Sequence, residues 1–412
     1  MSAQEVIVGL DIGTSKICAV IGEYNHNGML EITGVGTAPS RGLRRGVVIN
    51  IEATVKSIIT AIEAAELMSG REVDEVYSGL AGGDIEGINS RGVVAVTGRG
   101  REIANEDVER VIDAAKTIVI PMDREVLHVI PQEFIVDNQG GVKNPIGMMG
   151  VRLEAEVHII TGAISSAQNI VKCINRSGFK ACDLVLEPLA SARAVLSNDE
   201  KELGVLLIDL GCGTSDVMVF LNGAPYYTEV FPLGGEQVTN DLSIMLKTPI
   251  EAAEKIKLQS GCCYQELIQP EEEVLIPSVG GRAPRRIMRS DLTEIIQSRM
   301  QEIYGLIRSK VDEKGFLKML GGGVVLTGGG ALLPGAIELA MEIFGLPTRL
   351  GYPVKMGGLV EEYRHPAFST GVGLVMYADN QTEIREIKKP KEKKGSFKNV
   401  FDRMKDWFKE FI

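Results

Sequence analysis

The sequence is poor in the residues that mark disulfide-bonded, zinc-binding and membrane-spanning proteins. Its six cysteines include no C-x-x-C pair, and its four histidines show no ligand spacing, which excludes a disulfide framework and a zinc site. This cysteine usage predicts a reducing, intracellular location. No window approaches the roughly eighteen consecutive apolar residues of a spanning helix. The N-terminus also lacks a signal-peptide pattern, so we expect no transmembrane segment.

Basic residues are scarce as well. Lys and Arg number 44 against 55 Asp and Glu, a net charge of −11, which argues against a nucleic-acid-binding protein. The deficit is uneven, because residues 388–412 hold nine basic and four acidic side chains, a net of +5, and the rest of the chain carries −16. An acidic body with a basic tail indicates that the two parts meet different partners.

Several common catalytic motifs are missing. The chain contains no Gly-Lys dipeptide and therefore no P-loop. Gly211-Cys-Gly213 begins like a dinucleotide fingerprint, but Asp216 stands where the third glycine would be. Neither a G-x-S-x-G elbow nor an H-E-x-x-H helix occurs. The familiar hydrolase, metalloprotease and dinucleotide-binding classes are therefore excluded.

The hydrophobic pattern predicts an α/β architecture. With 44% hydrophobic side chains in 412 residues, the chain can build two to four domains. Short Val/Ile/Leu runs alternate with stretches of helical spacing. We expect strand pairs at 6–10 with 17–21 and at 205–208 with 217–221, a strand between the glycine clusters of 321–330, and helices at 51–68, 248–260 and 292–311.

An internal repeat gives the strongest functional signal. Asp11-Ile-Gly-Thr-Ser15 and Asp209-Leu-Gly-Cys-Gly-Thr-Ser215 are near copies, 198 residues apart, and each joins two apolar strands. This spacing suggests two related half-molecules. A tight Gly/Ser/Thr turn presents backbone N–H groups to a phosphate, and the aspartate can hold Mg²⁺ through water. One such turn is more often a plain hairpin, but two facing turns would clamp a nucleotide.

A third glycine cluster, Thr327-Gly-Gly-Gly-Ala-Leu-Leu-Pro334, would let the backbone approach a flat ligand closely. Taken alone, it could equally be an ordinary strand-to-helix turn. Together, the three motifs resemble the phosphate-1, phosphate-2 and adenosine motifs of the actin-like ATPase superfamily. The stretches 186–192 and 369–373 resemble its two connecting helices, and 253–257 resembles the helix that reaches the ribose.

This resemblance implies an ATP site with Mg²⁺, built from residues of all these motifs. Asp11 and Asp209 would organise Mg²⁺ through its waters, and Glu187 would polarise an attacking water. The phosphate, ribose and adenosine contacts would come from Gly13, Thr14, Ser15, Lys16, Gly211, Gly213, Thr214, Glu254, Lys257, Gly328, Gly329 and Gly330.

A narrower match lies between residues 83 and 162. The stretches His128-Val-Ile-Pro-Gln-Glu-Phe134, Asn144-Pro-Ile-Gly-Met148 and Gly150-Val-Arg-Leu-Glu154 resemble the FtsA family of bacterial cell-division proteins, and the likeness covers nearly the whole chain. It implies an actin-like two-lobed fold with an inserted α+β subdomain (1C), filament formation and at most weak ATPase activity. It also implies a tether that holds FtsZ to the cytoplasmic face of the cell membrane at the division site, together with other division proteins.

The resemblance divides the chain as follows. Subdomain 1A would take 1–82, 164–200 and 362–380, subdomain 1C 83–163, subdomain 2A 201–235 and 306–361, and subdomain 2B 236–305. A flexible basic linker at 381–395 and an amphipathic helix at 396–412 would complete the chain.

The expected subdomain 2B carries an arginine cluster in an otherwise acidic body. Four arginines fall between 282 and 289, and Arg299 follows ten residues later. The cluster is either a solvated basic loop or a surface that reads carboxylates through bidentate pairing. The family resemblance implies that Arg285, Arg299 and Glu302 bind the C-terminal peptide of FtsZ.

The tail is rich in aromatic residues, with five of the 21 aromatics and the only Trp in its last 17 residues. Its apolar residues recur at helical spacing opposite the charges. Such a helix could dock on a core or a partner, but its place after a linker and its lysines favour binding to anionic membrane lipids. The membrane-facing residues would be Phe397, Phe401, Met404, Trp407, Phe408 and Phe411.

Two alternatives stay open at this point. The chain could be a small-molecule kinase of the same superfamily, although no candidate base stands out beyond the nucleotide carboxylates. It could also be a pilus-assembly or rod-shape actin homologue such as MreB. The 1C motifs and the C-terminal helix argue against both the pilus-assembly homologue and MreB.

Overall fold

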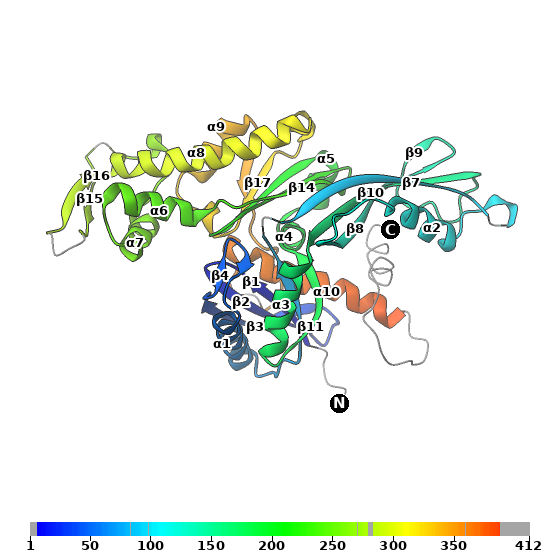
Figure 1. Ribbon diagram of the computed structural model, residues 1–412, viewed down its shortest axis with the longest axis horizontal. Coiled ribbons are helices and arrows are strands. Elements are labelled where there is room, and N and C mark those ends of the chain that lie inside the picture. Colours follow the sequence, from blue (N-terminus) through cyan, green and yellow to red (C-terminus); the bar gives the residue numbers. More distant parts are fainter. Residues whose placement is uncertain are drawn as a thin grey trace.

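The computed structural model describes residues 6–387, except residues 83, 98, 270, 279–282 and 359. Figure 1 shows a row formed by the second lobe with an extension at one end and the inserted subdomain at the other, and the first lobe beneath the middle of this row. The predicted amphipathic helix at 396–412 lies outside the described residues.

The first lobe is built on a five-stranded sheet in the order β11-β6-β1-β2-β3. Strands β1 to β3 form an antiparallel meander, and β6 and β11 continue it in parallel. Helix α1 packs on β2 and β3, whereas α10 packs on β1, β2 and β6. The elements of the first lobe are β1 (Val6–Ile12), β2 (Lys16–Tyr24), β3 (Leu30–Pro39), β4 (Leu43–Arg44), β5 (Val47–Val48), α1 (Ile51–Ser69), β6 (Glu75–Leu80), α3 (Ile164–Arg176), β11 (Lys180–Leu186), α4 (Glu187–Val195) and α10 (Ser369–Ile387). The short helix α5 (Asn198–Leu203), which follows α4 in the chain, packs against the second lobe.

Local sequence signals account for the ends of α1. The side chain of Asn50 accepts a hydrogen bond from the backbone N–H of Ala53, which caps the first turn. Gly70 ends the helix in the left-handed conformation, with its N–H donating to the carbonyl of Glu66. The helix predicted at 51–68 is therefore confirmed, and its apolar stripe packs on the sheet.

The second lobe repeats this plan. Strands β12 (Val205–Leu210), β13 (Ser215–Leu221) and β14 (Ala224–Phe231) form an antiparallel meander, which β17 (Val324–Thr327) and β18 (Thr348–Leu350) continue in parallel. The remaining elements of this lobe are η3 (Leu317–Met319), η4 (Gly329–Leu332), α9 (Ala336–Phe344) and η5 (Pro366–Phe368). The shared strand order confirms the two related halves predicted from the repeated motif.

The inserted subdomain is the α+β unit that the sequence predicted. It contains β7 (Glu86–Ala95), η1 (Arg99–Arg101), α2 (Asn105–Ala115), β8 (Arg124–Val136), β9 (Gln139–Val142) and β10 (Arg152–Ala163). Its strands do not form a separate sheet, because β7 pairs with β14 at Glu86 and Glu229 and so extends the second lobe's sheet to nine strands. The sequence patterns did not predict this continuity.

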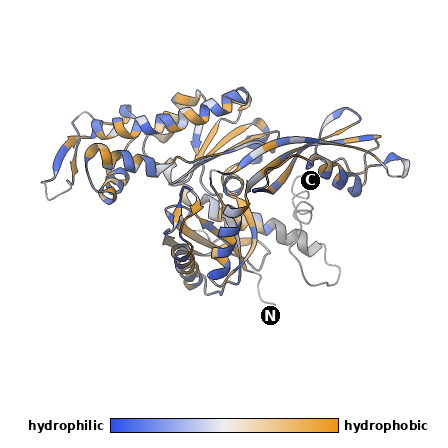
Figure 2. Ribbon diagram, viewed as in Figure 1, coloured by the Kyte–Doolittle hydropathy of each residue, from blue (hydrophilic) through white to orange (hydrophobic). Residues whose placement is uncertain are grey.

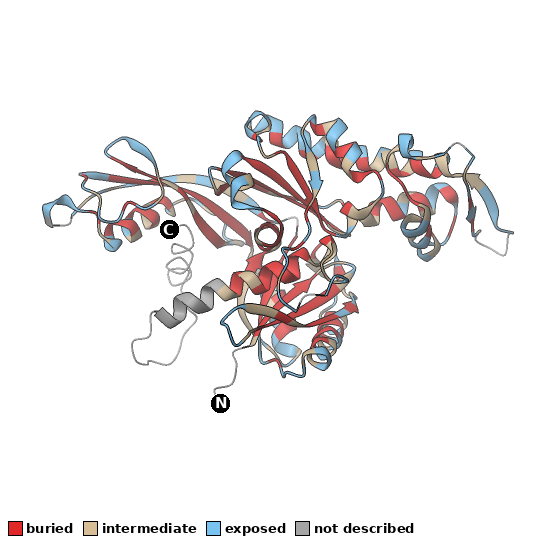
Figure 3. Cartoon of the chain, turned by 180° about the vertical axis from the view of Figure 1, so that it is seen from behind, coloured by how far each residue is buried: buried red, intermediate tan, exposed pale blue. Residues whose placement is uncertain are grey.

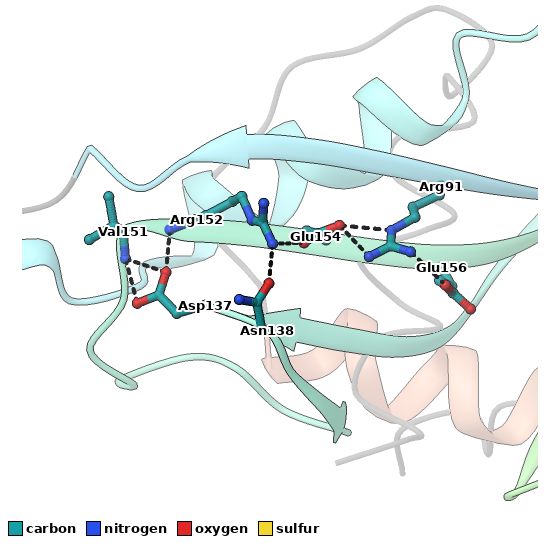
Figure 4. A network of polar contacts seen from close by, with 7 residues as sticks. All are labelled: Arg91, Asp137, Asn138, Val151, Arg152, Glu154 and Glu156. Carbon is teal, nitrogen blue, oxygen red and sulfur yellow. Dashed lines mark hydrogen bonds and ion pairs between the residues drawn. The ribbon is translucent and has the colours of Figure 1, made fainter.

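A polar network ties the strands of the insert together near its outer end (Figure 4). Glu154, which is buried, accepts a 2.7 Å hydrogen bond from Nε of Arg91 and pairs with Arg152 at 2.8 Å. Asp137 in turn accepts hydrogen bonds from the backbone amides of Val151 and Arg152. Because a buried carboxylate is costly without partners, the two arginines make Glu154 tolerable there.

The extension consists of helices and one hairpin, and all of it lies on the second lobe's side. Its elements are α6 (Gly235–Leu246), α7 (Ile250–Ser260), η2 (Gln265–Leu267), β15 (Glu273–Ile276), β16 (Arg285–Met288) and the long α8 (Arg289–Glu313). Figure 2 shows apolar and polar residues alternating along α8, and its buried residues, such as Ile296 and Ile303, join the core of the second lobe. The helices predicted at 248–260 and 292–311 are confirmed.

One boundary prediction is wrong. Residues 381–387, expected as the start of an extended linker, continue helix α10 to Ile387. They include Glu, Gln, Arg and Ile but no Gly or Pro, so nothing interrupts the helix before Pro390. The remainder of the expected linker lies outside the described residues.

The central strands of both lobe sheets, β1, β2, β12, β13 and β17, are almost wholly buried, as seen from behind in Figure 3. Each sheet is therefore covered on its two faces, as the continuous apolar runs in the sequence required. Within the described ranges, no helix combines the length and apolarity needed to cross a membrane.

Candidate nucleotide-binding site

The two repeated turns meet in space. The turn after β1 carries Thr14, and the turn after β12 carries Gly213. A Cβ added to Gly213 would stand 2.6 Å from Oγ1 of Thr14 and 2.9 Å from Cα of Arg45. A glycine is thus required for the close approach, and the facing arrangement predicted from the repeat is confirmed.

A cavity of about 480 Å³ lies where the turns meet. All the residues that the sequence proposed for nucleotide, metal and catalysis line it, although they come from motifs spread over more than 300 residues. They are Asp11, Gly13, Thr14, Ser15, Lys16, Glu187, Asp209, Gly211, Gly213, Thr214, Glu254, Lys257, Gly328, Gly329 and Gly330. Cavities of this size with a few convergent polar groups are typical of small-molecule sites.

Two aspartates stand at the ends of equivalent strands in this cavity. Burial raises the pKa of Asp11 to about 6, a shift that Lys16 opposes and Asp209 reinforces. Burial also raises the pKa of Asp209, but hydrogen bonds from Ser191 and Thr370 counteract it. The Ser191 hydroxyl donates to Oδ2 of Asp209 at 2.5 Å, and Thr370 donates to the same oxygen at 3.3 Å.

Two further carboxylates complete an acidic wall. Burial, and then the charges of Asp11, Asp216 and Asp209, raises the pKa of Glu187 well above its usual value. Burial and the charge of Asp209 raise the pKa of Asp216 to about 8. Oε1 of Glu187 and Oδ1 of Asp216 are buried and accept no hydrogen bond in the described part of the chain. Unpaired buried oxygens are rare in folded proteins, and in a cavity they are typical of a functional site.

In the sequence, Asp216 stands out only as the residue in place of the third glycine of a dinucleotide fingerprint. In the structure it pairs across the β12–β13 hairpin with Asp209 and accepts a 2.9 Å hydrogen bond from Oγ1 of Thr214. Its position seven residues after Asp209, on the strand that follows the turn, was the signal that could have revealed it. Ser191 and Thr370 had no such signal, because only the fold brings them to Asp209.

The cations of the cavity already have partners. Nζ of Lys16 donates to the carbonyl of Ala367 at 2.6 Å and lies 3.5 Å from the centroid of the Phe368 ring. Nζ of Lys257 pairs with Glu254 at 2.7 Å and donates to Oγ1 of Thr239 at 2.8 Å. Glu254 and Lys257 therefore form a fixed pair on α7, at the side of the cavity formed by the extension.

The third glycine cluster borders the opposite wall. It follows β17, which lies beside β12 in the sheet, and the N–H of Gly328 donates to the carbonyl of Pro366 at 3.2 Å. Oγ1 of Thr327 lies 2.7 Å from Oγ of Ser369, at the start of α10. These contacts connect the cluster of the second lobe to the last helix of the first.

The predicted partner-binding residues lie elsewhere, on the extension. Arg285 of β16 is exposed and donates to the carbonyl of Leu246 at 3.0 Å. Arg299 of α8 is bound by both carboxylate oxygens of Asp241, at 2.6 and 3.0 Å, and also contacts Glu302. Both arginines thus flank α6, but the guanidinium fork of Arg299 is not open, contrary to what a carboxylate-reading surface would suggest. The sequence could not reveal this pairing, because Asp241 is 58 residues away.

The other arginines of the cluster are paired too. Arg286 bonds Glu273 at 2.9 Å, and Arg289 donates to the carbonyl of Ser260 at 2.9 Å and contacts Glu272. Arg282 lies outside the described residues. The residues predicted to face the membrane, from Phe397 to Phe411, lie outside them as well.

Comparison with solved structures identifies the fold. The PilM–PilN type IV pilus biogenesis complex matches with a TM-score of 0.66 at 15% identity over 92% of this chain and 99% of that chain. MreB5 of Spiroplasma citri bound to ADP matches with a TM-score of 0.56 at 13% identity over 93% of this chain and 98% of that chain. At these identities the likeness establishes the actin-like fold alone, and it confirms the predicted fold class.

Comparison of sequences identifies the family. A model described as "Cell division protein FtsA" matches residues 206–373, and one described as "SHS2 domain inserted in FTSA" matches residues 82–161. The cell division protein FtsA of Borreliella burgdorferi is 49% identical over 98% of both chains. The similarity to this relative is one of sequence over almost the whole chain. The similarity to the pilus and rod-shape homologues is one of fold only. The chain therefore belongs to the FtsA family of cell division proteins.

Proposed function

We propose that the chain binds ATP with Mg²⁺ between its lobes and uses the nucleotide-bound form to polymerise on the cytoplasmic membrane, where it tethers FtsZ at the division site. The observation that carries the nucleotide part is the convergence of three separate motifs on one cavity of about 480 Å³. The solved structure of MreB5 bound to ADP supports it, since that protein shares the fold.

Asp11 and Asp209 are the residues that would hold Mg²⁺. Among the described residues, no three carboxylate, imidazole or thiol groups converge closely enough to ligate a metal directly. The buried acidic wall, with unpaired oxygens on Glu187 and Asp216, suits an ion that keeps several of its waters and bridges phosphates. When bound, Mg²⁺ would neutralise phosphate charge and lower the proton affinity of these carboxylates.

Glu187 is the residue best placed to polarise water, and its surroundings favour slow hydrolysis. It begins helix α4 directly after β11 and lines the cavity. Burial and the neighbouring carboxylates raise the pKa of Glu187 well above its usual value, and a carboxyl in its protonated form cannot accept a proton from water. We therefore expect a nucleotide-dependent assembly protein with at most weak ATPase activity.

FtsZ would bind the extension, beside α6. Arg285 is exposed and has no acidic partner among the described residues, so it is available to a carboxylate of the FtsZ C-terminal peptide. Arg299 of α8 contacts the same helix α6 through Asp241 and also contacts Glu302, and these residues would shape the surface. The tail from Phe397 to Phe411 would anchor the assembly to anionic lipids, with its aromatic face in the interface.

Co-sedimentation with liposomes and FtsZ, with and without residues 396–412, tests the proposal. The full-length protein with Mg·ATP should carry FtsZ into the liposome pellet, and the truncated protein should leave it in solution. Failure of the full-length protein to recruit FtsZ would overturn the tethering function. Binding of a fluorescent ATP analogue, measured without liposomes, tests the nucleotide site separately.

A further inference from the structure

A short hairpin places unpaired arginines beside the point where the two phosphate turns meet. The hairpin consists of β4 and β5 and carries Arg44 and Arg45, and Arg41 precedes it. All three arginines are exposed. None of their side chains forms a hydrogen bond or ion pair with a described residue, whereas Arg285, Arg286, Arg289 and Arg299 of the extension all have partners. The family's phosphate motifs do not account for this group.

The backbone of this hairpin is anchored to the site. The N–H of Gly46 donates to Oγ1 of Thr14 at 3.0 Å, and Gly46 lines the cavity. On its other side, a Cβ added to Gly46 would stand 2.9 Å from the backbone nitrogen of Gly82. The hairpin turn therefore contacts the first phosphate turn on one side and the segment that follows β6 on the other. These two contacts hold it beside the cavity.

Arg45 is held in an unusual conformation at the tip. Its φ is 50° and that of Gly46 is 76°, the pattern of a two-residue type I′ hairpin. A non-glycine residue with positive φ costs free energy, and such residues concentrate at functional sites. The Cα of Arg45 also faces Gly213 of the second phosphate turn, so this residue touches both lobes.

The acidic side chains that line the cavity outnumber the basic ones. Its lining carries the carboxylates of Asp11, Glu187, Asp209 and Asp216, in addition to the paired Glu254. Lys257 is taken by Glu254, and Lys16 donates to the carbonyl of Ala367. A polyphosphate entering such a site needs positive charge at its terminal end, and Arg45, whose Cα lies against Gly213 where the two phosphate turns meet, is an unpaired source of it.

We propose that Arg45 contacts the terminal phosphate of a bound nucleoside triphosphate and so distinguishes it from the diphosphate. This inference rests on the proposed nucleotide function. If the glycine cluster 328–330 receives the base, the terminal phosphate lies where Thr14 meets Gly213, next to Arg45. In this proposal the backbone of the hairpin stays in place while the exposed side chain of Arg45 turns towards the terminal phosphate. The contact would join the hairpin to the second lobe only when the third phosphate is present.

Nucleotide affinity of the full-length chain tests this proposal. Dissociation constants for Mg²⁺ complexes of a non-hydrolysable ATP analogue and of ADP are measured for the wild type and for Arg45→Asn, since Asn tolerates positive φ. Loss of one charge-assisted contact should weaken binding of the triphosphate about tenfold and binding of the diphosphate less than about twofold. Arg45→Lys should recover part of the triphosphate affinity, and Arg41→Ala, the matched control, should change neither constant.

The other outcomes separate the two ideas. If Arg45→Asn weakens the affinity for both nucleotides equally, the residue contributes only general electrostatic attraction. If neither affinity changes, the side chain does not reach the nucleotide. Either result overturns the role of Arg45 and leaves the proposed nucleotide function standing. If the wild type binds neither nucleotide, the proposed nucleotide function fails, and the inference fails with it. Melting curves of each variant show whether a lost affinity comes from lost folding.

Discussion

The hydroxyl of Ser191 donates a 2.5 Å hydrogen bond to Oδ2 of Asp209 and thereby connects helix α4 to the first strand of the second lobe. Thr370, at the start of α10, donates to the same oxygen at 3.3 Å and lies 3.0 Å from the Ser191 hydroxyl. Helices α4 and α10 thus both reach one carboxylate. Asp209 is also proposed to hold Mg²⁺. The same residue therefore takes part in the contact between the lobes and in the proposed metal binding.

Ser191→Ala removes the stronger of these two donors. Because a hydrogen bond to a buried charge contributes about 1.5–3 kcal/mol, we expect the free energy of unfolding to fall by about 2 kcal/mol, together with weaker Mg²⁺-dependent nucleotide binding. Urea unfolding and nucleotide titration measure the two effects. Ser166→Ala, which loses only an exposed 3.4 Å contact with Asp84, is the control and should change neither quantity.

The acidic wall predicts a pH dependence of stability. The pKa of Asp216 is raised from 3.8 to about 8, and that of Asp11 to about 6. At a pH above about 4 but below these raised pKa values, the two carboxyl groups hold protons in the folded protein that the unfolded chain has released. The free energy of unfolding of the nucleotide-free protein should therefore fall as pH rises from about 4 to about 8.

Asp216→Asn removes one of these titrating groups. The free energy of unfolding of this variant should therefore fall less steeply with pH than that of the wild type, by up to about 1.4 kcal/mol per pH unit. Urea unfolding at pH 5, 6, 7 and 8 provides the measurement. Asp199→Asn, at an exposed position of α5, should leave the slope as in the wild type. Parallel curves for Asp216→Asn and the wild type would contradict the raised pKa.

Glu187→Gln separates binding from hydrolysis. The amide resembles the protonated carboxyl that burial favours, so the fold and the affinity for Mg·ATP should change little. Whatever hydrolysis the wild type shows should slow by at least about tenfold, because the amide cannot take a proton. Phosphate release under single-turnover conditions measures this rate, with Glu251→Gln on α7 as a control. An unchanged rate would assign the activation of water to another group.

Arg285 and Arg286 are neighbours with different partners, which makes them a matched pair. Arg285 lies beside α6, whereas Arg286 pairs with Glu273 on β15. Arg285→Ala should weaken an acidic FtsZ tail peptide about tenfold and change the free energy of unfolding by less than about 0.5 kcal/mol, since the site is exposed. Fluorescence anisotropy of a labelled peptide measures the affinity. Equal losses in Arg285→Ala and Arg286→Ala would indicate general attraction by charge.

For the tail, we expect Trp407→Glu to abolish liposome binding, while high salt only weakens it. Each large apolar side chain that enters the interface contributes about 1.5–3 kcal/mol, and each lysine near an anionic leaflet about 1 kcal/mol. The apolar face should therefore dominate. Flotation with anionic and neutral vesicles at low and high salt provides the test, and complete release by salt alone would reverse this ranking.

Much of the fold could be predicted because its signals are local. The apolar runs at β1 and β12, the turns after Asp11 and Asp209, and the caps of α1 each depend on neighbours in the chain. The repeated motif also indicated two equivalent halves that face each other. The one wrong boundary, at the end of α10, lies where no glycine or proline marks a helix end, so local patterns had little to distinguish helix from linker.

What only the tertiary structure decided are contacts between distant segments. The donation from Ser191 to Asp209, the pairing of Arg299 with Asp241, and the joining of β7 to β14 link residues that no periodicity relates. The proton affinities of Glu187 and Asp216 likewise arise from burial and mutual charge, which exist only after folding. The sequence by itself determined which residue types could form a nucleotide site; the packing of the two lobes decided their charge, their partners and which arginines remain unpaired.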